Sequence, residues 1–149
     1  FTDILLVFPL YADGIPSTLL QFLKTLGSSP AQHKPRVSVL INCGFIEPEQ
    51  NDVAVEMIQL FCKQNGYPFG SVLKIGSGEA ILTTPFRFLV RTKIKKLAAS
   101  IAAQEYGVWQ VTMPLSKRMF IRASSRYWER YGMQNGLTKA QMASMDIEP

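Results

Sequence analysis

The stretch from residue 3 to residue 17 constrains the fold of this chain more than any other part of the sequence. It begins with an apolar run over residues 4–8, which Pro9 interrupts before a short polar turn. A strand that is apolar at every position belongs in a parallel sheet with both faces covered, because neither side of it meets water. After the turn, apolar residues recur at helical spacing, and Pro16 stands where a first helical turn is expected. The stretch therefore predicts a strand, a loop at its carboxyl end and a helix.

Two further apolar runs repeat this pattern of strand, loop and helix. Residues 37–41 form the first, which ends at a glycine-containing turn over residues 42–45. A helix is then predicted from a cap at Asn51 or Asp52 to about Gln64. We expect its buried face to carry the apolar side chains that recur at helical spacing, namely Val53, Met57, Leu60 and Phe61.

The third apolar run, residues 69–75, leads into a glycine-rich turn over residues 76–79. The turn favours a tight strand-to-helix connection over a phosphate site, because no complete phosphate-binding fingerprint surrounds it. Pro85 opens a long helix that we expect to end at Gly107, before a connector over residues 108–114. The buried stripe of this helix is predicted to contain Phe86, Val90, Ile94, Leu97 and Ile101. Successive strand–helix units predict an α/β fold with a parallel sheet and right-handed crossovers.

A helical tail follows, with one helix predicted over about residues 116–134 and a short one that Thr138 caps. The short helix is expected to include Ala140, Met142 and Met145. The buried side of the longer helix is predicted to hold Phe120, Ala123, Tyr127 and Tyr131. Arginines recur at intervals of four along another face of it, at Arg118, Arg122, Arg126 and Arg130. We expect this arginine stripe to be solvated, although such a stripe is also compatible with binding an NADPH phosphate, nucleic acid or an acidic partner.

Composition narrows the class of protein. With 149 residues, 47% of them hydrophobic and 18% charged, the chain is expected to form one domain. No apolar run approaches the roughly 18 residues of a membrane span, and no nucleic-acid-binding motif accompanies the net charge of +5. Cys43, Cys62 and His33 are too few for a disulfide scaffold or a zinc site, so we expect no metal. We predict reduced thiols, a cytoplasmic location and neither membrane nor nucleic acid as a partner.

The first loop resembles that of a known family. Its motif, Pro9-x-Tyr11-x-x-Gly14-x-Pro16-Ser17, is similar to the flavin-binding loop of flavodoxin-fold NAD(P)H-dependent FMN reductases and quinone reductases. The resemblance continues to a carboxyl-terminal motif that contains Tyr127-Trp128, Gly132 and Gly136-Leu137-Thr138-Lys139. It implies a flavodoxin-like three-layer α/β/α fold with extra carboxyl-terminal helices. In that fold, residues 1–149 supply strands 3–5 as the carboxyl-terminal part of one flavin-binding domain, and the strand with the phosphate loop precedes residue 1.

The resemblance also implies which residues hold the cofactor. Tyr11 would stack on the flavin ring, and Gly14 would let the backbone approach the ring without a Cβ. Backbone N–H groups of the second turn would bond to the pyrimidine edge of the flavin. We expect no catalytic side chain, and no nucleophilic role for Cys43, because the one histidine lies toward the opposite end of its strand. The expected cofactor-binding residues are Pro9, Leu10, Tyr11, Ala12, Asp13 and Gly14 in the first loop and Asn42, Cys43, Gly44 and Phe45 in the second.

The function that the resemblance implies is that of an FMN-dependent NAD(P)H oxidoreductase. Hydride would pass from NADH or NADPH, the substrate, to FMN and then to a small-molecule electron acceptor such as a quinone or a nitro compound. The resemblance also implies a homodimer. Two other classes stay open. One is an FMN electron carrier of the flavodoxin type, and the other is a non-catalytic interaction module that uses the arginine stripe.

Overall fold

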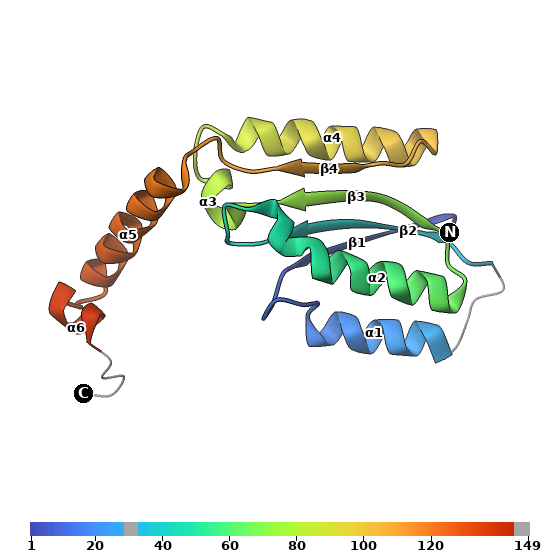
Figure 1. Cartoon of the computed structure of the whole chain (residues 1–149), viewed down its shortest axis with the longest axis horizontal. Helices are drawn as coiled ribbons and strands as arrows, with labels where there is room; N and C mark the ends of the chain where they lie inside the picture. The colour runs from blue at the N-terminus through green and yellow to red at the C-terminus, as the bar shows by residue number, and fades with distance from the viewer. Residues whose placement is uncertain (29–32, 145–149) are drawn as a thin grey trace. The chain divides into compact units, whose positions relative to one another are not determined.

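A computed structural model describes residues 1–28 and 33–144 of the chain. The chain divides into two compact units, residues 1–113 and residues 114–149. In the first unit, the described residues form a sheet of four parallel strands in the order β1-β2-β3-β4 (Figure 1). The strands are β1 (Asp3–Pro9), β2 (Arg36–Asn42), β3 (Phe69–Ile75) and β4 (Val108–Val111).

Helices connect the strands and flank the sheet. Those of the first unit are α1 (Ser17–Ser28), the short 3-10 helix η1 (Pro48–Asn51), α2 (Asp52–Asn65), α3 (Gly78–Leu82) and α4 (Arg87–Ala103). The predicted α/β class with a parallel sheet is confirmed, and the arrangement is consistent with a flavodoxin-like three-layer fold. Helix α4 ends before Gly107, because Gln104 takes a left-handed conformation with a φ of 57° and closes the helix.

Strand β4 was not expected, because residues 108–114 were predicted to be a connector. Its residues pair in register with β3, so that Val108 lies opposite Val72 and Val111 opposite Ile75. The segment is only four residues long, too short for its own sequence to mark it as a strand. Its extended conformation therefore depends on the neighbouring strand more than on its own sequence.

The face of the sheet that α1 and α2 cover holds the main hydrophobic core. Strand register aligns Leu6 with Val39 and Val39 with Val72, so one row of apolar side chains crosses three strands. These side chains pack with Leu23 of α1 and Ile58 of α2, both fully buried or nearly so. Burial of each such side chain stabilises the fold by about 1.5–3 kcal/mol.

Helix α4 covers the opposite face of the sheet over β3 and β4. The Ser71 hydroxyl on β3 hydrogen-bonds the Ser100 hydroxyl on α4 at 2.8 Å, and the Lys96 ammonium lies 5.4 Å from the centre of the Trp109 ring. Val90 and Leu97 are buried as predicted, but Ile94 is exposed. Ser100 takes a buried place that the apolar periodicity did not mark, because the hydroxyl on the facing strand supplies a partner for it.

The connection from β3 to β4 has the opposite hand to the two connections before it. All three connections advance in the same direction across the parallel sheet. Helices α1 and α2 lie on the face of Leu6 and Val39, whereas α4 lies on the face of Ser71 and Trp109. When two connections between parallel strands advance in the same direction but cross opposite faces of the sheet, they have opposite handedness. The expectation of uniformly right-handed crossovers is therefore wrong.

The predicted buried face of α2 is also wrong. The side chains that pack against the sheet are Ala54, Val55, Ile58 and Cys62, which are all buried. Val53, Met57 and Leu60 point away from the sheet and are exposed, and Phe61 is half-buried. The helix has two apolar stripes, and the sheet selects the one whose smaller side chains allow a close approach.

The second unit contains α5 (Lys117–Gln134) and α6 (Lys139–Ala143). The predicted Thr138 cap is confirmed, since its hydroxyl accepts a hydrogen bond from the Gln141 N–H at 3.2 Å within a capping box. The predicted Met145 in the last helix lies outside the described residues. All four arginines of the stripe are exposed, as expected. The predicted buried side is not buried within this unit, where Ala123, Tyr127 and Tyr131 are exposed and Phe120 is half-buried.

The outer edge of β1 has no partner strand among the residues that the structure describes. On the face that α4 leaves open, the β1 side chain of Leu5 is exposed and that of Val7 is 63% exposed. An apolar edge with free backbone N–H and C=O groups attracts further strands. The edge of β1 is therefore a part of the first unit that is prone to self-association.

A charge on this edge should suppress such association. We expect Val7→Lys to reduce light scattering by the concentrated chain while changing the free energy of unfolding by about 0.5 kcal/mol or less, because the side chain is exposed. Leu82→Lys is the matched control, since Leu82 is 53% exposed but lies on α3, away from the edge. Equal scattering from the Val7→Lys and parent chains would contradict the assignment.

Candidate functional site

The parallel strands place their carboxyl ends at one edge of the sheet, where ligands bind in open α/β folds. At this edge, backbone hydrogen bonds between neighbouring strands continue past the last residues that are paired in the sheet. The Leu10 N–H donates to the Asn42 carbonyl at 2.7 Å, and the Cys43 N–H donates to the Ile75 carbonyl at 2.9 Å. The Gly76 N–H donates to the Val111 carbonyl at 2.8 Å. The two predicted cofactor-binding loops, residues 9–14 and residues 42–45, are therefore neighbours.

The first loop closes in a tight turn from Tyr11 to Gly14. The two residues exchange backbone hydrogen bonds of 3.1 and 3.0 Å, and the central residues Ala12 and Asp13 have φ angles of 46° and 58°. Positive φ at both central positions is the requirement of a type I′ turn, and it costs about 1–2 kcal/mol for each residue that is not glycine. The turn holds the Tyr11 side chain outward, where it is 71% exposed.

Gly14 itself has no structural need for glycine in this loop. A Cβ built on it would lie 3.9 Å from the Met57 sulfur, which is an ordinary contact, and its φ is not in the left-handed region. The close approach of a ring to Gly14 therefore stays a prediction. The left-handed positions of the turn are Ala12 and Asp13; Asp13 was expected in a turn, but a positive φ was predicted for neither residue.

The second loop combines a buried thiol with open backbone donors. Cys43 is buried, and its sulfur accepts a hydrogen bond from the Asn51 side-chain amide at 3.3 Å. Within the described parts of the chain, the N–H groups of Gly44 and Phe45 have no hydrogen-bond acceptor. A Cβ at Gly44 would meet nothing within 4 Å, and the Phe45 ring is half exposed. The loop thus presents two free donors and an aromatic ring to the solvent.

The thiol of Cys43 is poorly suited to nucleophilic chemistry. Burial raises the pKa of the Cys43 thiol and outweighs its hydrogen bonds to Phe45 and Asn51, which lower the pKa; the carboxylates of Glu47 and Glu49 raise it by smaller amounts. A thiol with a raised pKa stays protonated at neutral pH, and the thiolate is the reactive form. The expectation that Cys43 has no catalytic role stays a prediction.

The third loop, residues 76–78, is packed inside the protein. A Cβ at Gly76 would lie 2.8 Å from the Ile46 carbonyl oxygen, and one at Gly78 would lie 2.9 Å from that of Cys43. Between them, Ser77 has a φ of 61°, and its hydroxyl hydrogen-bonds the Thr112 hydroxyl at 2.8 Å. Both glycines are therefore explained by close packing against the second loop, which supports the interpretation of a tight turn.

Two polar residues that organise this edge were not identified from the sequence. Asn51 was read as a possible helix cap, but its side chain makes no capping bond and is fully buried. Its amide nitrogen donates to the Pro48 carbonyl at 3.0 Å as well as to Cys43. Lys74, near the end of β3, forms a 2.6 Å ion pair with Asp52. The sequence did contain a sign of this ion pair, because a lysine inside a mostly apolar strand needs a partner of opposite charge.

Comparisons with protein-family models, with curated proteins and with solved structures give no match to this chain. Among the described residues, no helix is long and apolar enough to cross a membrane. In the same residues, no group of three or more His, Cys, Asp or Glu side chains is placed to hold a metal ion.

The left-handed turn of the first loop predicts an unusual gain in stability. Ala12→Gly should raise the free energy of unfolding by about 0.5–1 kcal/mol, because glycine adopts positive φ without a steric penalty. Ala98→Gly, at an exposed position inside α4, should lower it by about 1 kcal/mol. Urea unfolding measures both changes, and a loss of stability in Ala12→Gly would contradict the turn.

The second buried thiol, Cys62, gives a prediction at alkaline pH. Burial raises the pKa of the Cys62 thiol from 9.0 to about 11. As the pH rises from 9 to 11, the unfolded chain releases the thiol proton before the folded chain does, so the free energy of unfolding should fall. Cys62→Ala should remove this part of the pH dependence. Urea unfolding measures the free energy of unfolding at each pH. If this free energy falls equally with pH in the parent chain and in Cys62→Ala, the Cys62 thiol does not contribute to the pH dependence.

Proposed function

We propose that the loops over residues 9–14 and 42–45 hold the flavin ring of FMN, and that the chain belongs to an FMN-dependent NAD(P)H oxidoreductase. One observation carries the proposal. At the carboxyl edge of the sheet, the outward Tyr11 ring stands on a closed turn next to a loop whose Gly44 and Phe45 N–H groups are free among the described residues. A planar heteroaromatic ring with acceptor atoms along one edge fits such a pair of loops.

Each loop has a separate task in this proposal. Tyr11 supplies a stacking surface in a fixed orientation, because the hydrogen bonds between Tyr11 and Gly14 hold the turn closed. The N–H groups of Gly44 and Phe45 donate to the pyrimidine edge of the ring, where negative charge gathers on reduction. FMN supplies the redox chemistry itself, by accepting hydride from NADH or NADPH and passing electrons to a small-molecule acceptor.

The chain needs no acid–base side chain for this chemistry. The free donors stabilise the reduced ring, and the buried Cys43 thiol stays neutral behind them. The loops over residues 9–14 and 42–45 would hold only the ring of the flavin, since they contain no arginine or lysine that could bind a phosphate. An electron carrier of the flavodoxin type would use the same loops, and only turnover of NAD(P)H distinguishes the two functions.

The stacking role of Tyr11 is tested by its removal. Tyr11→Ala should weaken the binding of FMN by about 1–3 kcal/mol, the loss expected when an aromatic stacking partner is removed. The loss should be the same for lumiflavin, which has the ring but no phosphate. Quenching of flavin fluorescence by the intact protein that carries this chain measures both affinities.

Tyr106→Ala is the matched control, because Tyr106 precedes β4 and its ring contacts Arg36 at the amino end of β2, at the opposite edge of the sheet. It should leave both affinities unchanged. Unchanged affinity in Tyr11→Ala would refute the stacking role. Flavin that binds but is not bleached by NADH or NADPH would favour the electron carrier over the oxidoreductase.

A further inference from the structure

The outer side of α4 carries a row of cations that has no counter-charge in the described first unit. Arg87, Arg91 and Lys95 follow one another at intervals of four residues, so they stand on successive turns of one helix face, about 6 Å apart along the axis. All three side chains are exposed, and none has an ion-pair partner among the described residues. The helix also contains Lys93 and Lys96, but no aspartate or glutamate.

This α4 row works against the helix that carries it. Like charges four residues apart repel each other, and a helix is stabilised by acidic residues in its first turn and basic residues in its last. In α4, Arg87 is the first residue, no acidic residue lies in the first turn, and no basic residue lies in the last. The stability of α4 therefore does not explain the row, whereas an external anionic surface would offset the repulsion.

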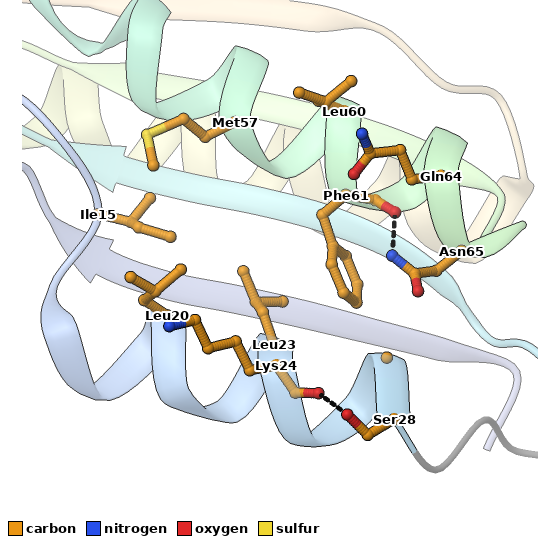
Figure 2. Close-up of a pocket in the computed structure, with 11 residues that line it drawn as sticks. Ile15, Leu20, Leu23, Lys24, Ser28, Met57, Leu60, Phe61, Gln64 and Asn65 are labelled. Carbon is orange, nitrogen blue, oxygen red and sulfur yellow. Dashed lines mark hydrogen bonds between the residues drawn. The ribbon is translucent and has the colours of Figure 1, made fainter.

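The opposite side of the first unit lacks such a row. A groove of about 440 Å³ lies there between α1 and α2, and Figure 2 shows apolar side chains such as Leu20, Met57 and Leu60 around it. Of the described residues that line this groove, only Lys24 is charged. The side of the sheet that α4 covers is therefore the one that would face an anionic partner.

Exposed apolar side chains flank the α4 row on both sides. Phe88 is 59% exposed and lies seven residues, or about two turns, before Lys95. Ile94 is 42% exposed and lies seven residues after Arg87. Cations with apolar neighbours on one helix face fit a membrane surface, where headgroup phosphates pair with the cations and apolar side chains reach the acyl boundary. A nucleic-acid backbone would pair with the cations but offers no apolar layer to Ile94.

We propose that the outer face of α4 binds the surface of a membrane that contains anionic phospholipids. The α4 row lies at the headgroups, and Phe88 enters the boundary with the acyl chains. A surface contact needs no membrane-spanning segment, so the proposal departs from the expectation that no membrane is a partner. It is independent of the proposed flavin site, because the loops over residues 9–14 and 42–45 take no part in the contact.

Vesicle flotation tests the contact, since bound protein rises with the vesicles and aggregated protein does not. The intact protein that carries this chain should float with vesicles of phosphatidylcholine and phosphatidylserine but not with phosphatidylcholine alone, and added salt should release it. Arg91→Gln with Lys95→Gln should weaken binding to the mixed vesicles by about 25-fold, about fivefold for each charge removed. Phe88→Ser should weaken it by about fivefold and leave its salt dependence unchanged.

Two control variants remove the same charge from other helices. Lys24→Gln with Lys63→Gln changes exposed lysines of α1 and α2. Arg122→Gln with Arg126→Gln changes the arginine stripe of α5. Neither control should weaken binding more than about twofold, because charges far from the contact are screened. Circular dichroism verifies that each variant is folded.

Three results would overturn the proposal: an intact protein that does not float with the mixed vesicles, folded α4 variants that bind like the parent, or an equal loss of binding in either control. Fluorescence anisotropy with labelled duplex DNA and single-stranded RNA tests the other anionic partner. Both should bind more weakly, per phosphate, than the mixed vesicles do. Tighter binding to either one, lost in Arg91→Gln with Lys95→Gln, would overturn the lipid assignment and give the face to a nucleic acid.

Discussion

Parallel strand pairing is the constraint on which the rest of the structure depends. Because β1 to β4 run in one direction, their carboxyl ends must emerge at the same edge, and loops that are distant in sequence become neighbours. The backbone bonds from Leu10 to Asn42 and from Cys43 to Ile75 carry the ladder past the paired residues. The starting position of each candidate loop is therefore fixed by the adjacent strand, and the spacing between the loops is fixed by the spacing between strands.

The fold class could be predicted because three mostly apolar strands each lead through a turn into a helix, and the first is apolar at every position from residue 4 to residue 8. Strand β4 could not, since its four residues gain their extended form by pairing with β3. The buried face of α2 was predicted incorrectly for a different reason. Val53, Met57 and Leu60 are as apolar as the stripe that is buried, and periodicity alone does not tell which stripe meets the sheet.

The candidate loops were located correctly at the carboxyl edge, because each follows a recognisable strand. Their internal conformations were not predictable. Nothing local marks Ala12 for a positive φ, and Asn51 has the sequence context of a helix cap although its amide is buried between loops. The positive φ of Ala12 belongs to a local turn closed by the Tyr11 and Gly14 backbones, whereas the buried place of Asn51 depends on its contacts with Cys43 and Pro48.

The inner and edge strands of the sheet differ in how many of their edges and faces are covered, so they should open at different rates within the native state. Strand β3 has a partner on each edge and a helix on each face, whereas β1 has one paired edge and, among the described residues, one covered face. Amide hydrogen exchange should therefore be slower in β3 than in β1, because local opening begins where fewer contacts are broken. The loop that carries Tyr11 is attached to β1, a strand at the edge of the sheet. A ligand bound there would slow exchange throughout β1, and its binding would be seen as rigidity in the sheet as well as occupancy at the edge.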